Sequence, residues 1–371
     1  MAKSTKAGRV NIRDLMKLVN KKAGRTVAHN LTGDNPTEVK EWIPTGSRWL
    51  DSIICKGRRG GIPVGKISEI AGLEATGKSY MAAQIAANAQ KQGKIVVYFD
   101  SESAIDPRFL TDAGCDLETL MYVQASSVEF VLETIEDLLS ASETQMVFIW
   151  DSLAFTPAIS DVEGDFNPQS SMAVKARILA KGMSKLTIPI ADEKATFIVL
   201  NQLKTNITQG PMARITAMTT PYTTPGGKAM HYSYSLRIWL TGRKAKSAFV
   251  LDENGYRIGS EVKVKLEKSR FGTAGRSCAF RIMWGSEVGI RDEESWFDAI
   301  KSSNCLTSKG AWYTLQTPDG YTKKFQPSKW NTLIGSDKDF RAKVMALMDE
   351  EIIYKFDNRL GNAENYYSDP E

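Results

Sequence analysis

Phosphate chemistry is indicated first by one run of eight residues with the pattern G-x-x-x-x-G-K-[ST]: Gly72-Leu73-Glu74-Ala75-Thr76-Gly77-Lys78-Ser79. Its two glycines let backbone N–H groups fold around a phosphate, and a helix that starts here adds the positive end of its dipole. The Lys78 side chain would reach the outer phosphates, and the Ser79 hydroxyl would bind Mg²⁺. The run therefore predicts a phosphate-binding loop between a strand and a helix.

Two acidic residues follow predicted strands, at the carboxyl ends where the ligands of α/β sheets gather. The strand over 94–99 leads to Glu102, and a carboxylate there can orient and deprotonate the water that attacks a γ-phosphate. The strand over 146–150 leads to Asp151, which would complete the Mg²⁺ shell. Taken alone, either acid could be an ordinary surface residue after a strand. Because both follow a phosphate-binding loop in the sequence, the pair indicates phosphate hydrolysis.

A third strand, over 196–201, leads to Gln202 and then to a long polar segment. A glutamine at this point could contact a γ-phosphate, with a simple strand cap as the alternative. The next 22 residues, 204–225, hold two cations and no acid. This composition favours single-stranded nucleic acid, because cations meet phosphates and apolar groups slip between bases, with a disordered insertion as the alternative. The candidate DNA contacts are Lys204, Met212, Arg214, Ile215 and Met218, with Gly226 and Gly227 at the end.

Two cations, Lys268 and Arg270, stand at the end of a strand predicted over 262–268. Cations at such a position could stabilise the charge that develops in phosphoryl transfer, as an arginine finger does from a neighbouring subunit. The alternative, from composition alone, is that this segment is a solvated strand at the edge of the sheet.

Bulk composition excludes several classes of protein. The 371 residues are 42% hydrophobic and 25% charged, which suits one large soluble domain with a smaller one. Neither an apolar run of 18 residues nor a secretory signal is present, so we expect a cytoplasmic protein without a membrane span. Four scattered cysteines and two histidines give little support to a disulfide framework, a zinc site or a histidine triad. The net charge of +5 combines a basic arm over 1–25 with a mildly acidic tail over 349–371. This pattern suggests that the ends bind a polyanion or a partner subunit, or that they are merely solvated.

Alternating strands and helices from 43 to 284 predict an α/β domain with a largely parallel sheet. Ser126-x-x-Glu129 predicts a capping box for one of its helices. Residues 1–42 predict a basic amphipathic helix over 12–19 and a linker, and 285–371 predict a small α+β domain with helices over 294–303 and 337–354. The predicted strands of the core are 66–71, 94–99, 121–124, 146–150, 196–201, 236–241, 262–268 and 279–284, and its main helices are 79–92, 127–140 and 172–190.

Taken together, these residues resemble the RecA-family DNA recombinases, with the phage recombinases of the UvsX type among them. The likeness covers residues 43 to about 356. It implies a RecA-type P-loop ATPase core with a mostly parallel twisted sheet, a short N-terminal helical arm and a small C-terminal α+β domain. Besides the motifs above, it rests on Gly60-Gly61-Ile62-Pro63-Val64-Gly65-Lys66, Phe99-Asp100-Ser101-Glu102-Ser103-Ala104-Ile105-Asp106-Pro107, Asp151-Ser152-Leu153-Ala154, Asn201-Gln202, Gly226-Gly227-Lys228-Ala229-Met230 and Gly310-Ala311-Trp312-Tyr313.

The resemblance implies ATP and Mg²⁺ as cofactors, and single- and double-stranded DNA as partners. It also implies a helical homo-oligomeric filament, with single-stranded-DNA-binding and loader proteins as further partners in a bacterial cell or a phage-infected host. The helix over 12–19 would dock on the next subunit. Residues 160–169 would be the first DNA loop and 204–225 the second. By resemblance, the site residues are Lys78 and Glu102 for catalysis, Gln202 for coupling ATP to DNA, Asp106 and Phe109 for adenine, and Lys268 and Arg270 for the ATP of the adjacent protomer.

Three departures from bacterial RecA are visible. Residues 151–157 are one residue shorter, Ser79 replaces a threonine, and Arg270 replaces a lysine. The predicted function is ATP-dependent pairing and exchange of homologous DNA strands. One alternative is a RecA-fold DNA motor such as a RadA-like helicase, which would be expected to carry a zinc module and a protease-like domain. Another is a non-catalytic mediator, which would have no need of the intact hydrolytic residues.

Overall fold

The computed structural model describes residues 11–32, 37–55, 60–163, 172–206, 215, 218–242, 248–284 and 288–349. The chain forms two compact units, Met1–Lys40 and Glu41–Glu371. The first contains α1 (Ile12–Ala23), which begins where Asn11 Oδ1 accepts the Arg13 N–H at 3.1 Å and ends at Gly24 in the left-handed conformation. The predicted amphipathic helix is confirmed, and it extends four residues beyond 19.

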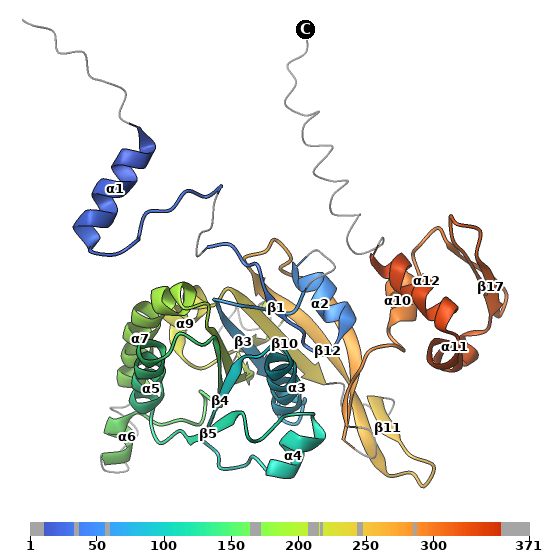
Figure 1. Cartoon of the computed structure of the whole chain (residues 1–371). Helices are drawn as coiled ribbons and strands as arrows, with labels where there is room; N and C mark the ends of the chain where they lie inside the picture. The colour runs from blue at the N-terminus through green and yellow to red at the C-terminus, as the bar shows by residue number, and fades with distance from the viewer. Residues whose placement is uncertain are drawn as a thin grey trace, which may run out of the picture. The chain divides into compact units, whose positions relative to one another are not determined.

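The second unit is built on a large sheet, whose strands in chain order are β3 (Ile67–Gly72), β4 (Ile95–Asp100), β5 (Leu120–Gln124), β6 (Met146–Asp151), β7 (Thr196–Gln202), β10 (Leu236–Gly242), β11 (Phe249–Leu251), β12 (Arg257–Ser269), β13 (Ser277–Met283) and β14 (Gly289–Arg291). In space the order is β14-β13-β12-β10-β3-β7-β6-β4-β5, with β11 beside β12. The strands from β10 to β5 run parallel, and those beyond β10 are antiparallel (Figure 1). Every strand predicted for the core is present.

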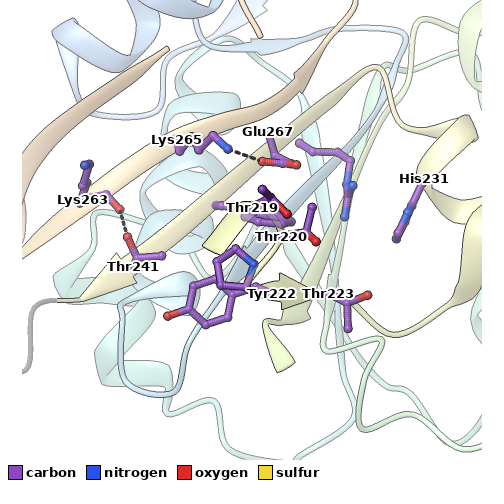
Figure 2. Close-up of a pocket in the computed structure, with 12 residues that line it drawn as sticks. Thr219, Thr220, Tyr222, Thr223, His231, Thr241, Lys263, Lys265 and Glu267 are labelled. Atoms are coloured by element: carbon purple, nitrogen blue, oxygen red, sulfur yellow. Dashed lines mark hydrogen bonds and ion pairs between the residues drawn. The ribbon is translucent and has the colours of Figure 1, made fainter. Parts of the chain in front are cut away.

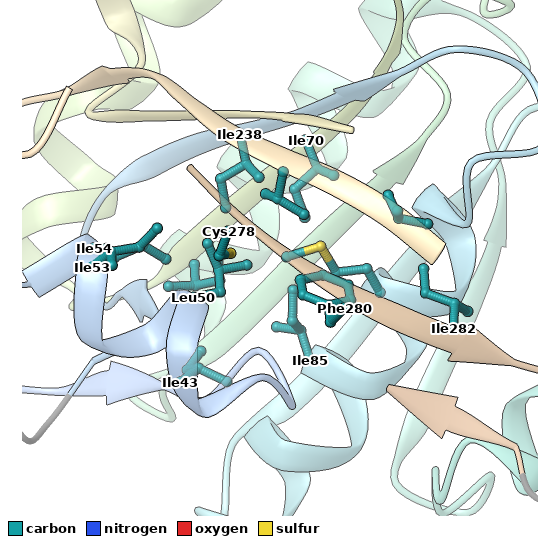
Figure 3. Close-up of a cluster of buried hydrophobic side chains, with 14 of the residues drawn as sticks. Ile43, Leu50, Ile53, Ile54, Ile70, Ile85, Ile238, Cys278, Phe280 and Ile282 are labelled. Atoms are coloured by element: carbon teal, nitrogen blue, oxygen red, sulfur yellow. The ribbon is translucent and has the colours of Figure 1, made fainter. Parts of the chain in front are cut away.

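Apolar helix faces cover both sides of this sheet. On one side lie α2 (Arg48–Cys55) and α3 (Lys78–Lys91), whose Ile54 and Ile85 belong to one buried apolar cluster with Phe280 of β13 (Figure 3). On the other side, α5 (Val128–Ala141) and α7 (Met172–Asp192) pack against Phe148 and Phe197. The segments that follow the carboxyl ends of β4 and β6 carry α4 (Pro107–Asp112) and α6 (Ile159–Glu163), and α9 (Gly227–Ser233) leads into the start of β10.

The start of α5 differs from the prediction. Its N-cap is Ser127, whose Oγ accepts the Phe130 N–H at 3.1 Å, and not Ser126. Glu129 Oε2 instead accepts the N–H of Ile159 at 3.0 Å, at the start of α6. The predicted capping box is therefore wrong, because the serine one position later has the extended backbone that an N-cap needs, and the glutamate binds another helix.

The C-terminal part combines a small sheet with short helices. The antiparallel strands β15 (Leu306–Lys309), β16 (Trp312–Gln316) and β17 (Thr322–Phe325) pack with α10 (Trp296–Ile300), η2 (Pro327–Lys329), α11 (Trp330–Ser336) and α12 (Lys338–Asp349). An aromatic cluster that includes Phe325, Trp330 and Phe340 joins them. The predicted small α+β element is confirmed, and the predicted helix over 337–354 is described as far as Asp349. The domain boundary at 284/285 stays a prediction.

A two-stranded ribbon, β1 (Trp42–Ile43) with β2 (Ile62–Pro63), lies at the start of this unit. Within the described ranges, no helix has the length and apolarity needed to cross a membrane. The four cysteines all lie in the described ranges, and none of them forms a disulfide.

Candidate functional site

The phosphate-binding loop lies where the sequence places it, between β3 and α3. Gly77 has φ 83°, in the left-handed region that favours glycine, and a Cβ there would displace the end of the Ile282 side chain. Lys78 Nζ lies across its own loop and donates to the carbonyl oxygens of Gly72 at 3.4 Å and Leu73 at 3.1 Å. Burial lowers the pKa of Lys78, and the carboxylates of Asp151, Glu102 and Glu74 oppose that shift.

The two candidate magnesium ligands are in direct contact. Ser79 Oγ donates to Asp151 Oδ2 at 2.8 Å, and the buried Tyr98 hydroxyl donates to the same oxygen at 2.9 Å. Burial raises the pKa of Asp151, while these two hydrogen bonds hold it down. A hydroxyl and a carboxylate are oxygen donors of the kind that Mg²⁺ prefers, so the pair fits this ion. Tyr98 was missed from the sequence, where a tyrosine in an apolar strand signals only that its hydroxyl needs a partner.

Glu102 is joined to β6, the strand that ends in the candidate magnesium ligand Asp151, through the residue that follows Asp151. Its Oε1 accepts the Ser152 hydroxyl at 2.9 Å, and Ser152 directly follows Asp151. The turn that carries Glu102 is held by buried Asp100, which accepts the N–H groups of Glu102 at 2.9 Å and Ile105 at 3.2 Å. The glutamate side chain is exposed, as a group that meets a substrate must be. Sequence reasoning missed these supporting roles of Asp100 and Ser152.

The candidate adenine contacts lie at the start of α4. Asp106 is its N-cap and accepts the Arg108 N–H at 2.8 Å. Phe109 packs edge-on against Tyr80, with ring centroids 4.7 Å apart. The Tyr80 ring is also close to that of Trp284, with centroids 6.4 Å apart, so aromatic side chains gather at the start of α3.

The segment predicted as the second DNA loop, 204–225, begins and ends in a short hairpin. Strand β8 (Lys204–Thr205) pairs with β9 (Tyr222–Thr223), directly after Gln202, whose side chain is exposed. Ile215 and Met218 are exposed, while the candidates Met212 and Arg214 lie outside the described residues. Gly226 and Gly227, with φ 108° and 79°, start α9. Of the first DNA loop, the described part is the end of α6.

The two strand-end cations bind α9. Lys268 Nζ donates to the carbonyl oxygens of His231 at 2.6 Å and Tyr232 at 3.2 Å, and Arg270 donates to Tyr232 at 2.7 Å. Cations at the C-terminal end of a helix are favoured by its dipole. The contacts described for this pair go to α9 rather than to the phosphate-binding loop of the same chain.

A pocket of about 360 Å³ opens beside the base of the second DNA loop (Figure 2). Tyr222, His231, Lys263 and Lys265 are among the residues that line it, and Trp239 forms part of its wall. The Trp239 indole is edge-on to Tyr222 at 6.5 Å, and its buried Nε1 has no hydrogen-bond partner. The surface next to this loop is thus cationic and aromatic.

The parallel sheet, the phosphate-binding loop and the strand-end acids together define a P-loop nucleotide-binding α/β protein. A family model described as the RecA N-terminal domain matches residues 10–290. Protein RecA of Fusobacterium nucleatum subsp. nucleatum is 33% identical over 307 residues, which cover 82% of this chain and 75% of that protein. Protein RecA of Bifidobacterium breve is 32% identical over 298 residues, covering 80% and 71%. Protein RecA of Saccharopolyspora erythraea is 31% identical over 284 residues, covering 76% and 77%.

The chain therefore belongs to the RecA family and is a RecA-type DNA recombinase. Membership implies, in general terms, a DNA-dependent ATPase that binds ATP with Mg²⁺ and forms filaments on DNA. The alternatives of a RadA-like helicase and a non-catalytic mediator are not favoured.

Proposed function

We propose that ATP hydrolysis at the phosphate-binding loop switches the two DNA loops of this recombinase between states that hold and release DNA. The observation that carries the proposal is the linkage of Ser79, Asp151, Ser152 and Glu102 by hydrogen bonds and one peptide bond. This linkage sets the candidate general base in a fixed relation to the candidate metal ligands.

In this proposal each residue has one task. The backbone N–H groups of the loop and Lys78 bind the phosphates, and Ser79 and Asp151 hold Mg²⁺, which would neutralise charge on the β- and γ-phosphates. Glu102 orients the attacking water and accepts its proton. Asp106 and Phe109 contact the adenine. Gln202 senses the γ-phosphate and passes its loss to the second DNA loop.

The DNA contacts are proposed from exposure and charge. Lys204, Ile215 and Met218 are exposed at the second DNA loop, which suits a single strand that offers phosphates and base faces. We assign Met212, Arg214, Gly226 and Gly227 to the same surface, and residues 160–169 to the first DNA loop. Single-stranded-DNA-binding and loader proteins would act on the filament, in a bacterial cell or a phage-infected host.

The filament is proposed from two features. Helix α1 exposes an apolar stripe that includes Ile12, Leu15 and Leu18, which is the kind of surface that docks on a neighbour. Lys268 and Arg270 would turn from α9 toward the ATP of the adjacent protomer. We propose a division into 1–42, 43–284 and 285–371. The start of the second compact unit at Glu41 supports the first boundary, and the end of the family model at residue 290 supports the second.

The test is a Glu102→Gln variant assayed for DNA-dependent ATP hydrolysis, with exposed Glu118→Gln as the matched control. We expect turnover to fall about 10²- to 10⁴-fold, because the amide cannot accept the proton, while ATP and DNA still bind. Unchanged turnover would contradict the assignment. Strand exchange between homologous DNAs by the unaltered protein then separates a recombinase from a motor.

A further inference from the structure

A buried polar network joins β3, β7 and β10 next to Gln202, and it contacts both ends of the second DNA loop. We propose that Glu69, Asn201, Arg237 and Thr224 are positioning residues that tie the loop to Gln202, so that a movement of either one shifts the other. The inference rests on the proposed function, in which Gln202 responds to the γ-phosphate and the loop binds DNA.

The centre of the network is the carboxylate of Glu69, which is fully buried on β3. Arg237, on the neighbouring strand β10, donates from Nε to Oε2 at 2.6 Å. Asn201, on the neighbouring strand β7, donates from Nδ2 to Oε1 at 3.0 Å. One carboxylate therefore binds the strands on both of its sides, and the arginine and asparagine are also buried.

Each of these two partners also binds an end of the loop. Asn201 Oδ1 accepts the Gln202 N–H at 2.9 Å, before the loop, and Asn201 Nδ2 donates to the Pro225 carbonyl at 3.0 Å, after it. Arg237 donates from its terminal nitrogen to Thr224 Oγ1 at 2.9 Å. The start and the return of the loop are thus held by the same buried carboxylate.

The network continues to α9. Thr224 Oγ1 lies 3.1 Å from His231 Nε2, and His231 forms one side of the pocket in Figure 2. The carbonyl oxygens of His231 and Tyr232 are those that bind Lys268 and Arg270. A shift of Thr224 would therefore also displace α9, the helix that binds Lys268 and Arg270.

The chemistry of this network favours a discrete response over a gradual one. A buried carboxylate and guanidinium are stable only while paired and fully hydrogen-bonded. The guanidinium presents its donors as a rigid fork, so Glu69 and Thr224 cannot move apart without breaking a bond. An element with two arrangements, biased by two ligands, is what couples binding sites.

The experiment measures how strongly ATP binding affects DNA binding. The Kd for a labelled single-stranded oligonucleotide is determined by anisotropy with and without a non-hydrolysable ATP analogue, and the ratio of the two Kd values is compared. Thr224→Val removes the hydroxyl and leaves the ion pair intact, and Arg237→Lys keeps the charge but loses the fork. Thr196→Val is the matched control, since this buried hydroxyl on β7 has no hydrogen-bond partner.

We expect the ratio to fall about tenfold or more in Thr224→Val and Arg237→Lys and to stay at its wild-type value in Thr196→Val. A general loss of DNA affinity or of folded protein would not by itself move this ratio. A wild-type ratio in both variants would overturn the inference and leave the proposed function standing. A ratio near one in the unaltered protein would overturn the proposed function and, with it, this inference. Should Arg237→Lys fail to fold, Thr224→Val alone decides.

Discussion

The two segments proposed as DNA loops, 160–169 and 204–225, are held at their bases in different ways. Beside the first loop, Lys175 of α7 donates to the carbonyl oxygens of Leu153 at 3.0 Å, Ala154 at 3.5 Å and Thr156 at 2.5 Å. Beside the second loop, the buried Glu69–Arg237 pair and Asn201 hold the chain through hydrogen bonds to Thr224 and Pro225. One closure is a half-buried cation on neutral carbonyls, and the other is a buried ion pair.

This difference predicts that disrupting the two sets of contacts costs unequal amounts of folding free energy. A cation on carbonyls can be removed without leaving an opposite charge behind, and the freed carbonyls can regain water. Removing one member of a buried ion pair leaves an uncompensated charge in the core. We infer that the first loop can rearrange at low cost, while the second loop moves only with the network that holds it.

The largest expected effect is that of Glu69→Ala, which leaves the Arg237 guanidinium buried without its carboxylate. We expect the free energy of unfolding to fall by about 3–5 kcal/mol, measured by chemical denaturation. The double variant Glu69→Leu/Arg237→Met removes both charges and should recover most of that loss. A loss below about 1 kcal/mol in the single variant would show that the pair behaves as a surface ion pair and would remove the contrast between the loops.

A smaller effect is expected for Lys175→Met at the first loop. The variant keeps the apolar stem and removes hydrogen bonds from a charged donor, so we expect a loss of about 1–2 kcal/mol in the same denaturation experiment. Exposed Lys181→Met on the same helix is the control and should be neutral. A loss equal to that of Glu69→Ala would mean that both closures are equally strong.

The smallest expected effect concerns pH at the second loop. Burial, followed by the charges of Arg237 and Lys268, lowers the pKa of His231 from 6.5 to about 4, with Glu267 opposing. The unfolded chain therefore binds a proton between pH 6.5 and 4 that the folded chain does not, so this stability is present above pH 6.5 and lost as pH falls through 4.

Because His231 is half exposed, solvent screening reduces this contribution. We expect His231→Gln to lessen the drop in melting temperature between pH 7 and pH 4.5 by about 1–2 °C. An identical drop in the variant and the wild type would exclude His231 as a titrating part of the network.

Much of the core was predictable because its signals are local. The strands and main helices follow from runs of apolar residues. Ser79 follows from the phosphate-binding motif, and Glu102, Asp151 and Gln202 follow from their places at strand ends. The structure joins Ser79 to Asp151 and, through Ser152, brings Glu102 to the same strand end.

The supporting residues were not predictable, although some left a signal. Glu69 and Arg237 are charged residues inside apolar strands, which suggests buried partners, but the sequence does not say that their strands are neighbours. Tyr98 in an apolar strand indicates only that its hydroxyl needs a partner, and the motif that contains Ser152 does not say which residue its hydroxyl binds. The capping box failed for a related reason, since Glu129 binds Ile159, a partner 30 residues away.

By itself the sequence determined the phosphate-binding loop, because all of its chemistry lies within eight consecutive residues whose glycines, lysine and serine permit few other structures. Only the tertiary structure decided how that loop is connected to the DNA loops. Glu69 and Arg237 are 168 residues apart and meet because β3 and β10 are adjacent in the sheet. Strand order arises from the packing of the whole core, so a contact that depends on it cannot be found in any local stretch of the chain.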